Sequence, residues 1–81
     1  MFWNRGDGSR LSADQLAKLR VRLSRLDVAA TPEEMDVPGF HFHPLKGERR
    51  GTYSVRVTGN FRLTFSWQGP DAVAVDLEDY H

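Results

Sequence analysis

Residues 53–67 read YSVRVTGNFRLTFSW, and this stretch decides the fold. Apolar and polar residues alternate on both sides of Gly59-Asn60, which is typical of two antiparallel strands joined by a tight turn. A two-residue loop would place the apolar Val57 opposite the charged Arg62. A three-residue loop over residues 58–60 instead pairs apolar with apolar side chains on one face, so it is the predicted connection. The expected pairs are Val57 with Phe61, Val55 with Leu63 and Tyr53 with Phe65.

The other face of this hairpin carries a predicted conflict of charge. The same register sets Arg56 directly opposite Arg62, and like charges in that position repel. An acidic side chain or a bound phosphate between the two guanidinium groups would remove the conflict. After a second turn, a last strand is predicted at residues 72–77, and face alternation makes Asp76 or Glu78 the expected partner of Arg62. A surface ion pair and a phosphate site both remain open.

The first half of the chain has helical periodicity. Leucines recur at helical spacing from Leu16 to Leu26, with basic residues mostly on the opposite side. Ser12 followed three positions later by Gln15 matches a capping box, the pattern that begins many helices. An amphipathic helix is therefore predicted over residues 13–27.

Two shorter elements are predicted between this helix and the hairpin. Pro32 followed by two glutamates opens a short helical turn, which a Pro-Gly pair ends. From residue 40 the period changes to two, because Phe40 and Phe42 alternate with His41 and His43. A short strand is predicted here, with both histidines on one face and Pro44 as its end.

These elements predict a single α+β domain over residues 1–81, with the helix packed on one face of an antiparallel sheet of three to four strands. The chain has no cysteine, which excludes a disulfide scaffold, thiolate metal sites and cysteine nucleophiles. No apolar run is long enough to span a bilayer, and no signal-peptide core is seen. A cytoplasmic protein is expected.

The formal net charge of zero hides blocks of opposite sign. Residues 5–25 hold six basic and two acidic side chains, and residues 46–62 hold five basic and one acidic. Residues 27–36 and 71–79 each hold four acidic side chains and no basic one. Either basic segment could face a polyanion, or the blocks could neutralise each other within the fold.

Three clusters contain groups suited to RNA cleavage by transesterification. This reaction needs a base for the ribose 2′-OH, an acid for the departing 5′-oxygen and cations for the charge that develops at phosphorus. The clusters are His41 and His43 with Lys46, Arg56 with Arg62, and the terminal run Glu78, Asp79, Tyr80 and His81. A second interpretation is a metal site built from His41, His43, Asp79 and His81, since a His-X-His strand points two imidazoles the same way.

Three motifs in order carry a specific resemblance: HPLKGERRGTYSV at residues 43–55, GNFRLTF at 59–65 and LEDYH at 77–81. The chain resembles the HigB branch (also called GraT) of the RelE/ParE toxins of bacterial type II toxin–antitoxin modules. The upstream helix and the MDVPGFHF lead-in at residues 35–42 also fit, so the resemblance covers residues 2–81.

The resemblance implies a ribosome-dependent endoribonuclease that cuts mRNA during translation and so inhibits it. It implies a HigA-like helix-turn-helix antitoxin as partner, and contact with operator DNA only through that antitoxin. It implies no cofactor and no metal, because the ribose 2′-OH is an internal nucleophile. The alternative is a toxin-like binding protein that acts on the ribosome, gyrase or antitoxin without cleaving RNA.

The same resemblance assigns roles to individual residues. It implies that His43, Asp79, Tyr80 and His81 are catalytic, with His43 and Asp79 transferring protons. Lys46 and Arg62 match phosphate-contacting residues, His41 is expected to touch RNA, and Arg56 is added as a phosphate contact by its position alone. The pKa of the His81 imidazole is expected to lie above its reference value, because acidic groups surround it in sequence.

Two further expectations concern the N-terminal half. Arg20 and Arg22 on the basic side of the helix are predicted to contact ribosomal RNA phosphates, unless that side is merely solvated or covered by the antitoxin. Family members usually begin with a strand and most of a helix, which this chain lacks before Met1. The sheet is therefore expected to miss the first family strand and to have an open edge.

Overall fold

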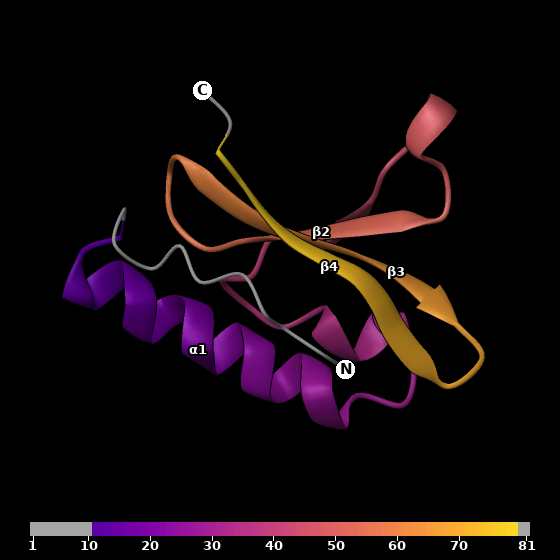
Figure 1. Cartoon of the computed structure of the whole chain (residues 1–81), viewed down its shortest axis with the longest axis horizontal. Coiled ribbons are helices and arrows are strands. Elements are labelled where there is room, and N and C mark those ends of the chain that lie inside the picture. The colour runs from indigo at the N-terminus through magenta and orange to yellow at the C-terminus, as the bar shows by residue number, and fades with distance from the viewer. Residues whose placement is uncertain (1–10, 80–81) are drawn as a thin grey trace.

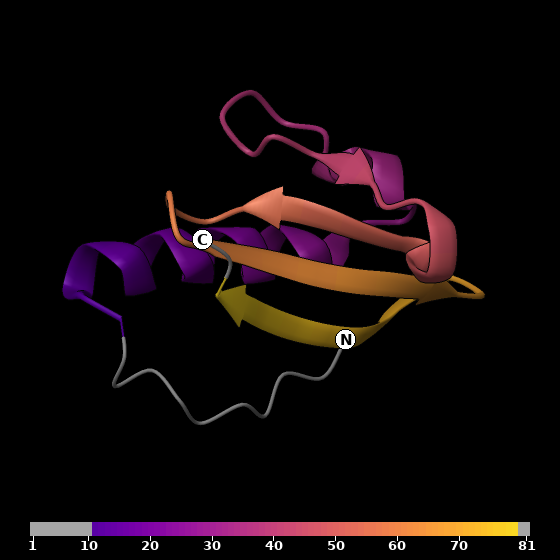
Figure 2. The same ribbon diagram turned by 90° about the horizontal axis from the view of Figure 1, so that it is seen from above.

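The computed structural model describes residues 11–79, in which one helix lies across one face of a four-stranded antiparallel sheet (Figure 1). The helix α1 spans Ala13–Val28, and two short 3-10 helices follow as η2 (Pro32–Met35) and η3 (Gly47–Arg49). The strands are β1 (His43–Pro44), β2 (Thr52–Arg56), β3 (Phe61–Gln68) and β4 (Asp71–Asp79). Their order in the sheet is β1-β2-β3-β4, as the view in Figure 2 shows. The predicted α+β architecture is confirmed.

The helix begins at the predicted capping box. The Gln15 backbone N–H donates to Ser12 Oγ at 3.1 Å, and the Ser12 backbone N–H donates to Gln15 Oε1 at 2.9 Å. Two of the orphan donors of the first turn are thereby satisfied. The helix ends at Val28, one residue beyond the predicted end, and the short turn expected at Pro32 is η2. Within residues 11–79, no helix has the length and apolarity that a membrane crossing requires.

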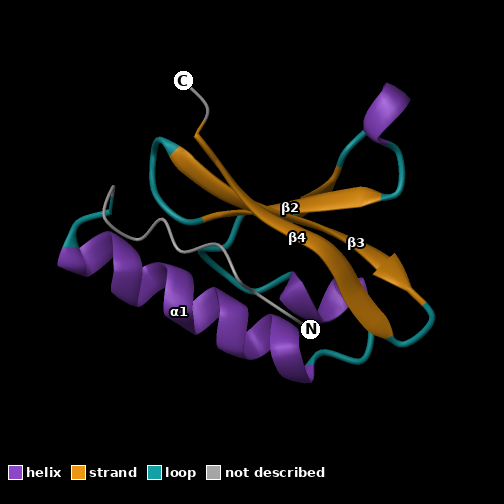
Figure 3. Cartoon of the chain, viewed as in Figure 1, coloured by secondary structure: helices purple, strands orange, loops and turns teal. Residues whose placement is uncertain are grey.

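Figure 3 shows α1 packed along one side of the sheet, and the buried apolar side chains of the two form one core cluster. Leu19 and Leu26 of the helix meet the inward face of the central strands, where Phe65 is fully buried. A row of aromatic rings runs along this layer, from Phe42 through Tyr53 and Phe65 to Trp67. Burying each large apolar side chain contributes about 1.5–3 kcal/mol. The remaining buried apolar side chains are Met35, Phe40, Val55, Val57, Phe61, Leu63, Ala72 and Leu77.

The hairpin between β2 and β3 has the predicted register. Val55 pairs with Leu63 and Tyr53 with Phe65, and the Val57 N–H donates to the Phe61 carbonyl at 2.9 Å across a loop of residues 58–60. The pattern of apolar pairs therefore predicted both the loop length and the face of every side chain in these strands.

β4 is longer than the predicted strand at residues 72–77 and contains a bulge. Ser66 pairs with Val73 but Thr64 pairs with Asp76, so one extra residue of β4 lies opposite Phe65. Ala74 adopts a φ of 53°, in the left-handed region. The bulge resets the alternation along β4, which lets Ala72 and Leu77 both face the core although an odd number of positions separates them.

The predicted strand at residues 40–43 is wrong in its extent. His41 has a φ of 51°, and only His43 and Pro44 pair with β2, so Pro44 lies within the strand rather than ending it. The chain turns at His41 because Phe40 is buried in the core, where its carbonyl accepts a 2.6 Å bond from the Arg56 N–H. Pro44 is tolerated because β1 is an edge strand of the described sheet, where a residue without a backbone N–H does not interrupt the hydrogen bonds to a second neighbouring strand.

Candidate active site

The face of the sheet away from α1 is polar because side chains alternate along β2 and β3. Ser54 and Arg56 lie on this face of β2, and Arg62 and Thr64 lie opposite them on β3. Arg56 pairs directly with Arg62, as the register predicted. Two guanidinium groups thus leave adjacent strands on the same side of the sheet.

A pocket of about 240 Å³ opens on this face and is lined by His41, His43, Ser54, Arg56 and Arg62. His43 reaches it because β1 pairs His43 with Ser54. His41 also lines it, although it lies before β1 rather than in a strand with His43. Two imidazoles and two arginines therefore share one concave site, which combines acid–base groups with fixed positive charge.

The His43 ring is held through one of its nitrogens. Its Nδ1 lies 3.1 Å from the His41 carbonyl oxygen. A proton on Nδ1 donates to that oxygen, which leaves Nε2 as the ring atom that can accept a proton. The left-handed backbone at His41 thus directs its carbonyl toward His43, and this contact orients the His43 ring.

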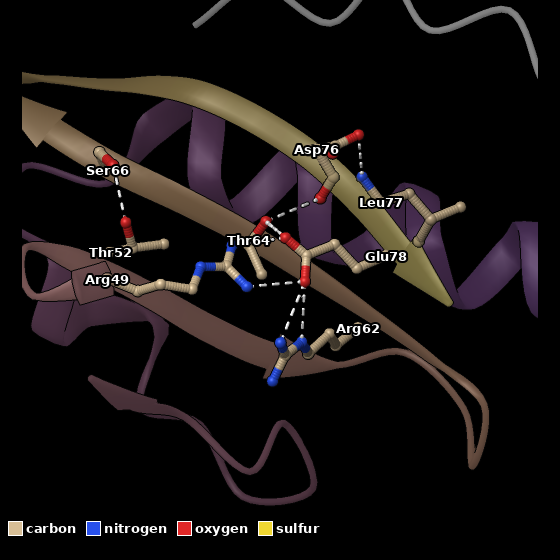
Figure 4. Close-up of polar contacts among 8 residues, drawn as sticks. All are labelled: Arg49, Thr52, Arg62, Thr64, Ser66, Asp76, Leu77 and Glu78. Carbon is tan, nitrogen blue, oxygen red and sulfur yellow. Dashed lines mark hydrogen bonds and ion pairs between the residues drawn. The ribbon is translucent and has the colours of Figure 1, made fainter. Parts of the chain in front are cut away.

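Glu78 of β4 is the centre of a polar cluster with Arg49, Arg62 and Thr64, here called the Glu78 cluster (Figure 4). Arg62 donates to Glu78 Oε1 through Nε at 3.2 Å and through Nη2 at 3.0 Å. Arg49 donates through Nη1 to Oε1 at 3.0 Å and through Nη2 to Oε2 at 2.5 Å. The Thr64 hydroxyl donates to Oε2 at 3.1 Å. The acidic partner predicted for Arg62 is confirmed as Glu78.

These donors change the acidity of Glu78. The hydrogen bonds from Arg49 first, then those from Arg62 and Thr64, lower the pKa of the Glu78 carboxyl to about 2 against an opposing effect of burial. The same contact raises the pKa of Arg49. Glu78 therefore carries its negative charge throughout the neutral range, where it cannot exchange a proton usefully. Arg49 was not predicted as a site residue, because nothing in a loop sequence indicates which strand a long side chain will reach.

Arg22 does not lie on an exposed basic face, which corrects its predicted role as a phosphate contact. It is 9% exposed. Its Nε donates to the Arg56 carbonyl at 2.7 Å, its Nη1 donates to the Lys18 carbonyl at 3.0 Å, and its guanidinium lies 4.4 Å from the Phe40 ring centroid. Position 22 falls within the buried stripe of α1, and burial lowers the Arg22 pKa. Arg20 is exposed as predicted.

The remaining candidate residues are placed as follows. Lys46 is exposed and precedes η3, outside the set that lines the pocket. Asp79 ends β4, where it pairs with Phe61, and it too is outside the set that lines the pocket. Tyr80 and His81, together with the pKa expected for His81, lie outside the described residues. Within residues 11–79 no group of three or more histidine, cysteine or acidic side chains is arranged to hold a metal ion.

The fold and the pocket define a class of small α+β proteins that present histidine and arginine side chains on the open face of an antiparallel sheet. The family model described as the RelE-like toxin of type II toxin–antitoxin system HigB matches residues 1–81, and the chain belongs to this HigB-like toxin family. Because toxins of type II systems act together with an antitoxin, the partner of this chain is an antitoxin. The chain is 33% identical to Endoribonuclease HigB of Proteus vulgaris over 81 residues, which cover 100% of this chain and 88% of that relative.

Proposed function

We propose that this toxin is an endoribonuclease that cleaves mRNA on the translating ribosome. The observation that carries the proposal is the pocket on the polar face of the sheet, where His41 and His43 lie together with Arg56 and Arg62. This combination suits a phosphodiester, because arginines bind its anionic oxygens and a histidine exchanges protons near neutral pH. The relative from Proteus vulgaris is named an endoribonuclease, which supports the same activity here.

The reaction we propose is transesterification through the ribose 2′-OH. A base removes the 2′-OH proton, the 2′-oxygen bonds to phosphorus, and the bond from phosphorus to the 5′-oxygen breaks as an acid protonates that oxygen. The products are a 2′,3′-cyclic phosphate and a 5′-hydroxyl. Because the nucleophile belongs to the substrate, the chemistry requires proton transfer and charge stabilisation and no metal ion.

We assign proton transfer to His43 and Asp79, and stabilisation of the phosphate charge to Arg62 and Lys46. His43 is supported by its orientation through the His41 carbonyl. Arg62 and Arg56 are supported by their place in the pocket, and on the same ground we propose His41 as a further RNA contact. Tyr80 and His81 are included on the family resemblance, Tyr80 to stack on a base or orient the 2′-OH and His81 as a second acid–base group.

The physiological setting we propose follows the family. The partner is a HigA-like helix-turn-helix antitoxin, operator DNA is contacted only through it, and the toxin acts in the cytoplasm on ribosome-bound mRNA. Co-purification of the chain with the product of the neighbouring gene, and relief of its toxicity by that product, test this assignment.

Primer extension on mRNA in a translating extract tests the activity. We expect discrete cleavage sites with the wild-type chain and at least a hundredfold loss of cleavage in the His43→Ala, Asp79→Ala double variant, a loss of the size seen when positioned acid–base groups are removed. Asp71→Ala, at the exposed opposite end of β4, is the matched control and should cleave normally. Undiminished cleavage by the double variant contradicts the assignment. Growth arrest with intact mRNA supports the non-cleaving alternative on the ribosome, gyrase or antitoxin.

A further inference from the structure

Glu78 lies beside the pocket, and the proposed reaction does not use it. The Glu78 side chain is 24% exposed, and that of its partner Arg62 is 23% exposed. Both are therefore partly shielded from water, where a charge-assisted hydrogen bond is stronger than at an open surface. Glu78 is also directly opposite Arg62 in the sheet, so the backbone register itself brings the two together.

The contacts between Glu78 and Arg62 constrain the direction of the guanidinium group. One carboxylate oxygen, Oε1, accepts from both Nε and Nη2 of Arg62. Two bonds to adjacent nitrogens orient the guanidinium plane, whereas a single bond would leave it free to turn. Arg62 lines the pocket, so this orientation decides which edge of the guanidinium faces a bound phosphate.

Glu78 is itself held from the other side. Arg49 donates to both of its carboxylate oxygens and Thr64 donates to Oε2, so the carboxylate cannot rotate freely. Arg49 belongs to η3 and Thr64 to β3, which means that donors from two separate elements converge on a carboxylate carried by a third, β4. A group held in this way can in turn hold the arginine beside it, because its own position is already determined.

We propose that Glu78 is a positioning residue that holds the Arg62 guanidinium toward the phosphate in the pocket. This inference rests on the proposed function. Fixed cations stabilise developing charge without reorganising during the reaction, so Glu78 acts on cleavage through Arg62 rather than by touching RNA. Glu78 also offsets the repulsion between Arg62 and Arg56, which lie opposite each other on β2 and β3.

A double-variant cycle tests whether Glu78 acts through Arg62. We expect Glu78→Gln to lower the single-turnover cleavage rate about tenfold, since misplacing a reacting or stabilising group by an ångström is costly. In an Arg62→Met background the same Glu78→Gln change is expected to alter the rate by less than about twofold, because the group that Glu78 positions is already gone. Glu48→Gln is the matched control, since Glu48 is an exposed glutamate of η3 next to Arg49.

Two results overturn the inference while leaving the proposed function intact. One is wild-type cleavage by a folded Glu78→Gln variant. The other is a full tenfold loss that persists in the Arg62→Met background, which would show a role independent of Arg62 or a merely structural one.

A spectroscopic measurement tests the positioning without relying on cleavage. In the wild-type chain we expect the Arg62 Nε–H to give a separate ¹⁵N NMR signal that exchanges slowly with water, because Glu78 accepts its hydrogen bond. In Glu78→Gln the signal should shift and exchange faster, while Glu48→Gln should leave it unchanged. An unaltered Arg62 signal in Glu78→Gln rejects the inference even if the wild-type chain proves not to cleave RNA.

Discussion

Arg22 of α1 donates its Nε–H to the backbone carbonyl of Arg56 at 2.7 Å, and this bond joins the helix to the strand that supports the pocket. The same guanidinium lies over the Phe40 ring at 4.4 Å. Phe40 in turn accepts the Arg56 N–H through its carbonyl, so helix, loop and strand meet around one arginine. A cation placed over an aromatic face and bonded to a carbonyl acts as part of the core rather than as surface charge.

Replacing Arg22 should therefore destabilise the fold. We expect Arg22→Ala to lower the free energy of unfolding by about 2–3 kcal/mol, because the Arg56 carbonyl loses its donor and the Phe40 ring loses its cover. Urea unfolding measures the change. Arg20→Ala, two residues away on the exposed side of α1, should cost less than about 0.5 kcal/mol. Equal stabilities of the two variants would contradict this role of Arg22.

Arg20 is the better probe of ribosome binding by the helix. Reversal of its charge in Arg20→Glu should weaken co-sedimentation with ribosomes and reduce the salt dependence of binding, because fewer counterions are released from RNA phosphates. The fold should survive, since Arg20 is exposed. The Arg20→Gln variant, which removes the charge without reversing it, should co-sediment less than the wild-type chain and more than Arg20→Glu. Identical sedimentation of all three chains at several salt concentrations rejects RNA contact on this face.

Glu78 makes the free energy of unfolding depend on pH in the acidic range. Its folded-state pKa, about 2, lies below the ordinary glutamate value of 4.5, so its contribution to stability is complete above the unfolded-state pKa and is lost as the pH falls toward 2. After allowance for solvent screening, we expect the wild-type chain to lose about 1–2 kcal/mol from this group over that window. The Glu78→Gln variant should have a lower free energy of unfolding at neutral pH. Acidification should then cost it about 1–2 kcal/mol less than it costs the wild-type chain. Unfolding curves that shift in parallel with pH for both chains would contradict the prediction.

The bulge in β4 predicts that a glycine substitution at Ala74 stabilises the fold. Ala74 has a φ of 53°, where a side chain is strained and glycine is not. We expect Ala74→Gly to raise the free energy of unfolding by about 0.5 kcal/mol, because relief of strain exceeds the added entropy of the unfolded chain. Thermal unfolding measures this. Ala72→Gly, at a buried position of the same strand, should instead be destabilising, and a loss of equal size at both positions would refute the interpretation.

Local pattern was sufficient for much of the fold. The capping box at Ser12 and Gln15, the leucine spacing of α1 and the loop at residues 58–60 all depend on residues close together in sequence, and all were predicted. The register of β2 against β3 then followed, because a shift of one residue would move every apolar side chain to the wrong face. That register was enough to place Arg56 beside Arg62 and to predict that an acidic side chain or a bound phosphate offsets their repulsion.

Contacts between distant segments were decided only by the tertiary structure. Gln68 pairs with Asp71 at the second turn, and continuing that register would set Leu77 opposite Arg62. The bulge at Ala74 shifts the pairing by one residue and brings Glu78 there instead, an adjustment that keeps Leu77 in the core.

The positions of Arg22, Arg49 and His41 likewise depended on packing. Arg22 is buried because its stripe of α1 packs on Phe40, and Arg49 reaches Glu78 across 29 positions of the chain. Sequence alone thus determined which face each residue of β2 and β3 takes, because alternation is a property of the local backbone. Which charges meet was decided by loop conformation and by long side chains, whose reach has no periodic signal in the sequence.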